Sequence, residues 1–261
     1  MFTLLLRIFL VVSVLVGLLA FPSPLVISLP HSFLPAFRDL SAPLGTDRLG
    51  RNIYSLYSWG ILATVVLAVP ARLFTILVSS FFSLLVFYAG KISGFVMQSV
   101  SSVFISIPSL LSALVIIQIF GSGFFILFLA ILVSDWAVAY ETIQNKVRDI
   151  ESSGYVVSAV CFGAGKFRIF RKHVLPGIFP VVYLLFVTGI PSVIMTLSIF
   201  SFLGVDMGTD VFGPGLGEQI SFSKDYSEKS LSSVVTPVVG ILVLIYSFGN
   251  NFSNNLSSKR N

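Results

Sequence analysis

The residues from Tyr155 to Pro176, YVVSAVCFGAGKFRIFRKHVLP, form a basic, glycine-containing segment between two long apolar stretches. Its basic side chains are Lys166, Arg168, Arg171, Lys172 and His173, and it has no acidic residue. Because cytoplasmic loops of membrane proteins carry an excess of Lys and Arg, this segment is predicted to be a cytoplasmic loop between two spans. Its first half, up to Gly165, is rich in small residues and weakly amphipathic, which is typical of a short surface helix that faces a soluble partner.

The composition indicates an integral membrane protein. Hydrophobic residues make up 56% of the chain and charged residues 10%, with a mean hydropathy of +0.98, whereas soluble domains carry about 25% charged residues. A soluble fold of 261 residues has no way to bury so much apolar surface. We attribute the net charge of +5 to membrane orientation and partner docking rather than to nucleic-acid binding. The single cysteine, Cys161, has no partner for an intrachain disulfide or a cysteine-based metal cluster.

Six apolar segments predict an all-α, polytopic protein with about six transmembrane helices, since each is close to the roughly 20 residues that a span needs. They run over residues 2–21, 57–88, 95–120, 124–143, 176–203 and 233–252. The second is long for a minimal span, so it is expected to tilt or to extend beyond the bilayer. The first is open to a second interpretation as a cleaved signal peptide, but the run Ala20-Phe21-Pro22 is a poor cleavage site, and a retained helix is expected.

The distribution of loop charges predicts that both termini are cytoplasmic. The loop between the fourth and fifth segments holds the most Lys and Arg, and an even number of spans returns the chain to the same side. Lys259 and Arg260 near the C-terminus agree, as does the acidic external loop 205–232. The first external loop, residues 22–56, carries more Arg than Asp and does not support this orientation.

A turn-rich polar cluster, Leu44-Gly45-Thr46-Asp47-Arg48-Leu49-Gly50-Arg51-Asn52, precedes the second segment. Its glycines permit tight turns, and Thr46 or Asp47 is expected to cap the helix that follows. Together with the loop ending in HVLPG, the pattern PLGTD-x-x-GR resembles the second permease subunit of the dipeptide, oligopeptide and nickel ABC importers. Three further matches are residues 107–111 (IPSLL), Trp136 and residues 201–204 (SFLG). The resemblance implies a permease domain at residues 43–261, preceded at residues 1–42 by a transmembrane helix and an external segment.

The resemblance also implies a complex in the bacterial inner membrane. In such importers this chain and a second permease subunit form the pathway by alternating access, cytoplasmic ATPase subunits bind below, and an external solute-binding protein delivers a peptide, nickel or a similar small solute. The chain has no GxxxxGK(S/T) phosphate loop. ATP hydrolysis is therefore expected on a separate subunit, and the chain itself is expected to be neither an enzyme nor a cofactor-binding protein.

The basic segment resembles the EAA loop, by which these permeases dock on the ATPase. Val157, Ser158 and Ala159 stand in place of Glu-Ala-Ala, Gly163 matches the glycine, and Val174-Leu175-Pro176 matches the hydrophobic-Leu-Pro ending. Val157 thus replaces the usual acid, and Glu141 stands where an Arg is common.

Each side chain of this loop has an expected role. Tyr155 and Phe162 are expected to supply apolar contact, and Gly163 to allow close approach of a partner. Lys166, Arg168 and Arg171 are expected to pair with acids of the ATPase or with lipid headgroups, or to act only as positive-inside anchors.

Arg72 and Asp135 lie inside predicted spans, and Gln118 is a milder polar case. Charges inside a membrane usually face a cavity or one another. They are therefore candidates either for the translocation pathway or for a buried ion pair between helices.

Two other classes of function were weighed against a permease. The absence of an acid at Val157 is compatible with a membrane scaffold or assembly protein that has a degenerate coupling loop. A membrane-embedded enzyme is disfavoured, because the chain has no HExxH or GxSxG motif and no paired carboxylates.

Overall fold

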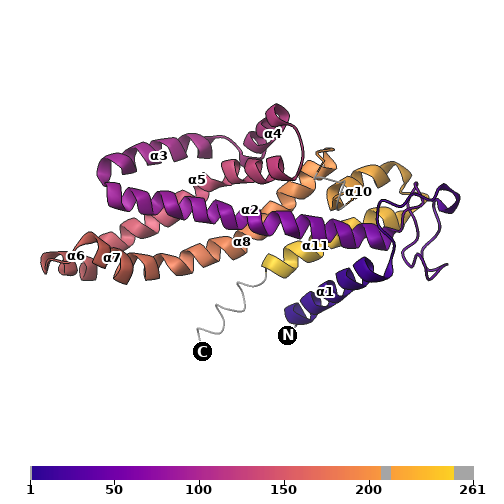
Figure 1. Ribbon diagram of the computed structural model, residues 1–261, viewed down its shortest axis with the longest axis horizontal. Helices are drawn as coiled ribbons and strands as arrows, with labels where there is room; N and C mark the ends of the chain where they lie inside the picture. Colours follow the sequence, from indigo (N-terminus) through magenta and orange to yellow (C-terminus); the bar gives the residue numbers. More distant parts are fainter. Residues whose placement is uncertain (1, 207–212, 250–261) are drawn as a thin grey trace. The chain divides into compact units, whose positions relative to one another are not determined.

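The computed structural model describes residues 2–206 and 213–249, and all regular elements in this part of the chain are helices (Figure 1). An isolated β-bridge joins Thr46 and Asn52. The predicted all-α class is confirmed. The end of the sixth apolar segment, with Lys259 and Arg260, lies outside the described residues.

The helices are labelled in chain order in Figure 1. They are α1 (Phe2–Ala20), η1 (Leu29–His31), α2 (Ile53–Ala89), α3 (Lys91–Ser106), α4 (Ser109–Phe120), α5 (Phe124–Glu151), α6 (Gly154–Cys161), α7 (Lys166–Ile169), η2 (Phe170–Val174), α8 (Leu175–Phe202), α10 (Leu216–Ser223), η3 (Lys224–Tyr226) and α11 (Leu231–Gly249). The short elements η1 and η3 are 3₁₀ helices, and η2 is a π-helical turn.

Four helical stretches in the described part are long and apolar enough to cross a membrane, or five if one bent pair counts as a single span. They are Ile53–Ala89, Phe124–Glu151, Lys166–Phe202 and Leu231–Gly249. At 1.5 Å per residue, α2 with its 37 residues is about 55 Å long and exceeds the roughly 30 Å hydrocarbon layer, as its length in sequence predicts. The apolar helix Leu5–Ala20 is shorter.

The third predicted span is not one straight helix. It is broken between α3 and α4, whose axes differ by 87°. Ile107 is extended, with φ −97° and ψ 126°, because the ring of Pro108 disfavours the helical conformation in the residue before it. Pro108 then begins a new helix, with its carbonyl accepting the backbone N–H of Leu111 at 2.9 Å.

The chain forms two compact units, each discontinuous in sequence. The first comprises residues 1–70, 117–128 and 190–261, and the second residues 71–116 and 129–189. In the first unit, Arg7 donates from Nε and Nη2 to the Ser247 carbonyl at 3.0 and 2.6 Å, which joins α1 to α11. Tyr54 donates to the Ser13 carbonyl at 2.8 Å, so α1 also contacts α2.

The second unit is held together by short polar contacts and apolar packing between α2 and α5. Ser79 Oγ donates to the Trp136 carbonyl at 2.8 Å, and Ser83 Oγ donates to Gln144 Oε1 at 2.7 Å. Such hydroxyl contacts bring membrane helices close together and are worth about 0.6–2 kcal/mol each. One apolar cluster beside them contains Val86, Trp136, Ala137 and Tyr140.

The cap of α2 differs from the prediction. Asn52, rather than Thr46 or Asp47, occupies this position: its Oδ1 accepts the backbone N–H of Tyr54 at 2.9 Å, and its Nδ2 donates to the Ser41 carbonyl at 2.7 Å. Thr46 and Asp47 organise the preceding loop instead. Asp47 accepts from Arg51 Nε at 2.7 Å, and Thr46 and Asp47 are both buried.

We expect Asn52→Ala to lower the free energy of unfolding by about 1 kcal/mol, since the exposed N–H groups of the first turn of α2 lose their acceptor. Asn52→Asp keeps the acceptor and loses only the donor to Ser41, so it should be milder. Thermal unfolding of the purified chain in detergent measures both. An unchanged midpoint in Asn52→Ala would show that the cap contributes nothing.

Candidate functional site

The predicted surface helix of the basic loop is α6, and a single side chain anchors it. Val156 is the buried residue of this helix, at 3% exposure. It packs in one apolar cluster of the second unit that includes residues from α2, α5, α7, η2 and α8: Phe87, Val147, Ile150, Ile169, Val174 and Ile178. The rest of α6 is left available for another molecule.

The outward surface of the loop, from α6 to the first residues of the candidate span Lys166–Phe202, exposes several large apolar side chains. Phe162 is 92% exposed and Phe167 66%. Tyr155, Val157 and Val160 are also exposed. Contiguous exposed apolar side chains commonly mark a surface that binds another protein or a membrane. We call these five residues the docking surface.

Gly163 ends α6 in a specific geometry. Its φ is +83°, a left-handed conformation that favours glycine. The N–H of Ala164 bonds to the Ala159 carbonyl at 2.9 Å, and the N–H of Gly163 bonds to the Val160 carbonyl at 2.9 Å, which together make a Schellman motif. No atom lies within 4 Å of where a Cβ would stand, so the backbone conformation, and not crowding inside this chain, requires glycine here.

The other predicted loop residues lie largely at the surface. Ser158, Arg168, Arg171 and Pro176 are exposed, and Ala159 is half-buried. Pro176 has no N–H to bond to the carbonyl of Lys172, which lies in the π-helical turn η2 immediately before it.

Lys166 is turned toward the helices. It donates from Nζ to the carbonyl of Tyr88, at the C-terminal end of α2, at 3.3 Å. The positive charge of Lys166 is also stabilised by the negative, C-terminal end of the α2 helix dipole.

The structure brings Arg72 and Asp135 together. Arg72 Nη1 lies 3.6 Å from Asp135 Oδ2, and the two side chains are 9% and 26% exposed. Arg72 also donates from Nε and Nη2 to the Leu185 carbonyl at 3.1 and 2.8 Å. A Cβ at Gly189 would collide with the guanidinium, so the absent side chain makes room for it. Gln118 is exposed on α4 and belongs to the other compact unit.

Sequence reasoning missed several partners of these residues. A backbone acceptor such as the Leu185 carbonyl leaves no trace in the sequence, although Gly189 four residues later was a usable signal of close approach. Glu141 is bonded to Ser101 Oγ, which gives a role to an acid that was noted only as a departure from the family pattern.

The loop 205–232, predicted to be external, contains a helix, α10, in its described part, which its polarity did not predict. In α10, Gln219 is buried and donates to the Leu56 carbonyl at 2.7 Å. Burial raises the pKa of the neighbouring Glu218, chiefly by removing water from its carboxylate.

Apolar helices of spanning length and an exposed helix on a basic loop define a polytopic helical membrane protein. The family described as "Binding-protein-dependent transport system inner membrane component" matches residues 75–259, more than half of the chain. The chain belongs to this family.

Individual relatives are more distant. The chain is 28% identical over 161 residues to the dipeptide transport system permease protein DppC of Bacillus subtilis, covering 62% of this chain and 50% of that protein. It is 25% identical over 252 residues to the nickel transport system permease protein NikC of Escherichia coli, covering 93% and 88%. The alignment with DppC thus spans about half of that relative's length.

Among solved structures, an inward-facing form of the MetNI methionine ABC transporter is similar, with a TM-score of 0.61. The match has 17% sequence identity and covers 78% of this chain and 95% of that one. At this identity the likeness supports the fold alone.

The Arg72–Asp135 contact predicts coupled effects of mutation. Arg72→Ala should be the more harmful single change, because it also removes both donors to Leu185. Asp135→Ala leaves the cation with its carbonyl partner. The double variant should be less destabilised than the sum of the singles, with a coupling of about 1 kcal/mol.

Thermal unfolding of the four forms measures this coupling. Strict additivity would eliminate the ion pair as a stabilising contact. Arg72→Met is a second test of the cation, since it keeps much of the aliphatic stem.

The geometry of Gly163 predicts that its substitutions act on the loop backbone. Gly163→Ala should destabilise the end of α6 by about 1 kcal/mol, whereas Gly163→Asn should be milder because Asn tolerates the left-handed conformation. Gly165→Ala is a matched control: this glycine has φ −71° and open space around its Cβ position. Hydrogen exchange at residues 160–166 measures the change, and equal effects of Gly163→Ala and Gly165→Ala would contradict the assignment.

Proposed function

We propose that this chain is a transmembrane permease subunit of an ATP-driven ABC importer and that it forms part of the solute pathway by alternating access. The observation that carries the proposal is the docking surface on α6 and α7, in a chain that belongs to a family of transport-system membrane components. The relatives named for dipeptide and nickel transport support a peptide, nickel or a similar small solute.

The proposed partners follow from this assignment. ATP hydrolysis takes place on separate cytoplasmic ATPase subunits, a second permease subunit completes the pathway, and an external solute-binding protein delivers the solute. The complex lies in the bacterial inner membrane with both termini of this chain in the cytoplasm. The Lys and Arg of the α5–α8 connection support this orientation.

The proposed coupling runs through Val156. Since its side chain belongs to the apolar cluster that also contains Ile150 of α5, Ile178 of α8 and Phe87 of α2, we expect a displacement of α6 to act on all three helices. The ATPase subunits move this helix when they close on ATP. They drive the transition only to the extent that they bind the two states of the permease with different affinity.

Val157 changes the chemistry of docking without removing the docking surface. It is 49% exposed and lies among other exposed apolar side chains, so it supplies buried apolar area where related loops have a carboxylate. A scaffold with a degenerate loop is the alternative. It would bind partner subunits without coupling ATP hydrolysis to solute movement.

We propose that the Arg72–Asp135 pair is structural and does not contact the solute. Two of the guanidinium N–H groups are committed to Leu185, and only Nη1 faces the carboxylate. Arg72 has a side-chain exposure of 9%, which leaves little room for a solute group beside it.

The proposal predicts that Phe162→Ala weakens binding of the ATPase subunits and lowers ATP-dependent uptake in proteoliposomes at least fivefold. The reason is that a 92% exposed aromatic ring loses its burial at the interface. Phe125→Ala is the matched control, because this ring is 72% exposed on α5, away from the loop.

The measurement compares co-purified ATPase, ATP hydrolysis and solute uptake in both variants. Unchanged uptake in Phe162→Ala would overturn the docking role of this residue. ATPase binding without any ATP-dependent uptake in the unsubstituted complex would favour the scaffold.

A further inference from the structure

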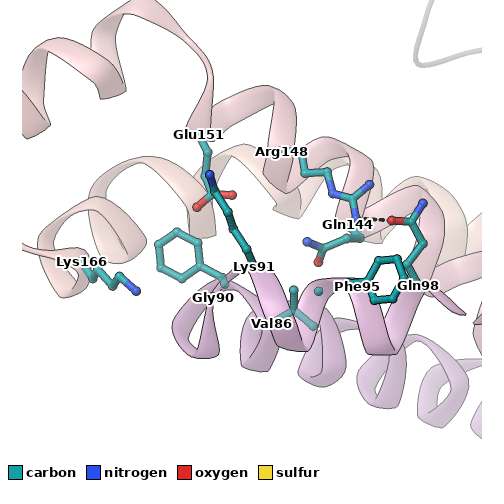
Figure 2. Close-up of a pocket in the computed structure, with 11 residues that line it drawn as sticks. Val86, Gly90, Lys91, Phe95, Gln98, Gln144, Arg148, Glu151 and Lys166 are labelled. Atoms are coloured by element: carbon teal, nitrogen blue, oxygen red, sulfur yellow. Dashed lines mark hydrogen bonds between the residues drawn. The ribbon is translucent and has the colours of Figure 1, made fainter. Parts of the chain in front are cut away.

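A polar cavity opens beside the basic loop, within the second compact unit. Its volume is about 410 Å³, within the range of small-molecule sites. The C-terminal end of α2, the start of α3, the end of α5 and Lys166 of α7 line it (Figure 2). Its lining residues are Val86, Phe87, Gly90, Lys91, Gly94, Phe95, Gln98, Gln144, Arg148, Glu151 and Lys166.

The charges in this cavity favour an anion. Lys91, Arg148 and Lys166 are cationic, against the single carboxylate of Glu151. In the described part of the chain no salt bridge joins Glu151 to any of the three. The cavity therefore carries a positive surplus that is not cancelled by a close contact.

Each of the three cationic side chains has N–H groups that are free to donate hydrogen bonds to a bound anion. Arg148 donates from Nη2 to Gln98 Oε1 at 3.0 Å, as the dashed line in Figure 2 shows, and this leaves most of its five N–H groups. Lys166 donates once, to the Tyr88 carbonyl. The side chain of Lys91 has no hydrogen bond or ion pair among the residues that the structure describes.

An apolar groove of about 510 Å³ lies next to the cavity, also within the second unit. It is lined by Phe81, Leu84, Leu85, Tyr88, Ala89 and Phe170. The rings of Phe87 in the cavity and Tyr88 in the groove have centroids 5.2 Å apart. Lys166 donates from the cavity to the Tyr88 carbonyl, and both compartments are lined by residues at the C-terminal end of α2.

We propose that this pair of compartments binds one anionic phospholipid, with its phosphate among Lys91, Arg148 and Lys166 and one acyl chain in the groove. A basic pocket between helices at the end of a span is the kind of site that recognises an anionic headgroup. The apolar groove argues against an acidic side chain of a partner protein as the bound group. Such a group would match the cations but leave the apolar groove uncovered.

The bound lipid would connect the loop to the helices. Lys166 lies on α7, immediately after the turn that ends α6, whereas Lys91 and Arg148 lie on α3 and α5. A phosphate shared among them would join α7 to α3 and α5, in addition to the Arg148–Gln98 and Ser101–Glu141 hydrogen bonds between α5 and α3 and the contacts of Lys166 and the apolar cluster. This proposal goes beyond the transport function and requires only that the chain lies in a membrane.

Native mass spectrometry of the full chain, with its partner subunits where they co-purify, tests the proposal. The probes are phosphatidylglycerol and phosphatidylcholine with the same acyl chains. We expect one phosphatidylglycerol to be retained per chain at a concentration at least tenfold lower than that needed for phosphatidylcholine. Equal retention of the two lipids would overturn the proposal.

The variants locate the site. Lys91→Gln with Lys166→Gln should reduce the preference for phosphatidylglycerol at least fivefold. Arg168→Gln with Lys172→Gln removes the same charge from exposed positions outside the cavity and should leave the preference unchanged. Lys91→Gln alone has no described contact to lose, so a reduced preference there supports the site even if Lys166→Gln disturbs folding. Equal losses in the cavity and control variants would overturn it.

Two competition experiments, with inorganic phosphate and with the ATPase subunits, distinguish a bound lipid from a free anion and from a protein contact. Inorganic phosphate at millimolar concentration should not displace the lipid, because it has no chain for the groove. Displacement by phosphate would indicate a free-anion site, and displacement by the ATPase subunits would indicate a protein contact; either result would overturn the lipid assignment.

Discussion

The guanidinium of Arg72 sits well inside α2, where a bilayer provides no water to solvate it. Its hydrogen bonds go to the Leu185 carbonyl, and its remaining face lies 3.6 Å from Asp135. One side chain therefore ties α2 to both α5 and α8. Gly189 is part of the same arrangement, because any side chain there would displace the cation. The spacing of the three helices at this level is set by the planar guanidinium and its acceptors, which a lysine ammonium would not reproduce.

The same face of α2 continues this contact toward the basic loop. Ser79 follows Arg72 by one heptad and Ser83 follows after four more residues, so all three lie on one side of the helix. Both serines bond across to α5. Beyond them the apolar cluster around Val156 fixes α6 to the same helices. The loop to which we assign ATPase coupling is thus attached to a helix pair whose register is specified by polar contacts.

The sequence predicted the features that depend on composition and hydrophobic periodicity. It did not predict the features that depend on the three-dimensional arrangement of the chain. Apolar stretches and loop charge were enough for an all-α membrane protein with a short helix after residue 153. A single span was predicted over residues 95–120, whereas the structure breaks it at Pro108, because a proline inside an apolar run is compatible both with a mild kink and with a full break. The cap of α2 was predicted at Thr46 or Asp47, five or six residues before Asn52, since all three are good capping residues and only the fold of the loop distinguishes them. The Leu185 carbonyl could not be predicted as the partner of Arg72, because every residue has a backbone carbonyl and the side chain at this position gives no signal.

The substitution at Val157 is best understood together with its surroundings. A carboxylate at a docking helix gives a contact that salt screens, whereas apolar side chains give one that depends on buried area. Here Val157, Val160 and Phe162 are all exposed, while the basic side chains nearby either remain in solvent or, like Lys166, turn toward the helices. The apolar and the basic side chains of the loop are therefore available for different contacts. Its apolar face is available to a partner protein, and its cations lie where an anionic membrane surface can hold the loop in place. On the proposed function, loss of the acid at one position thus removes one kind of docking contact without removing the exposed apolar surface.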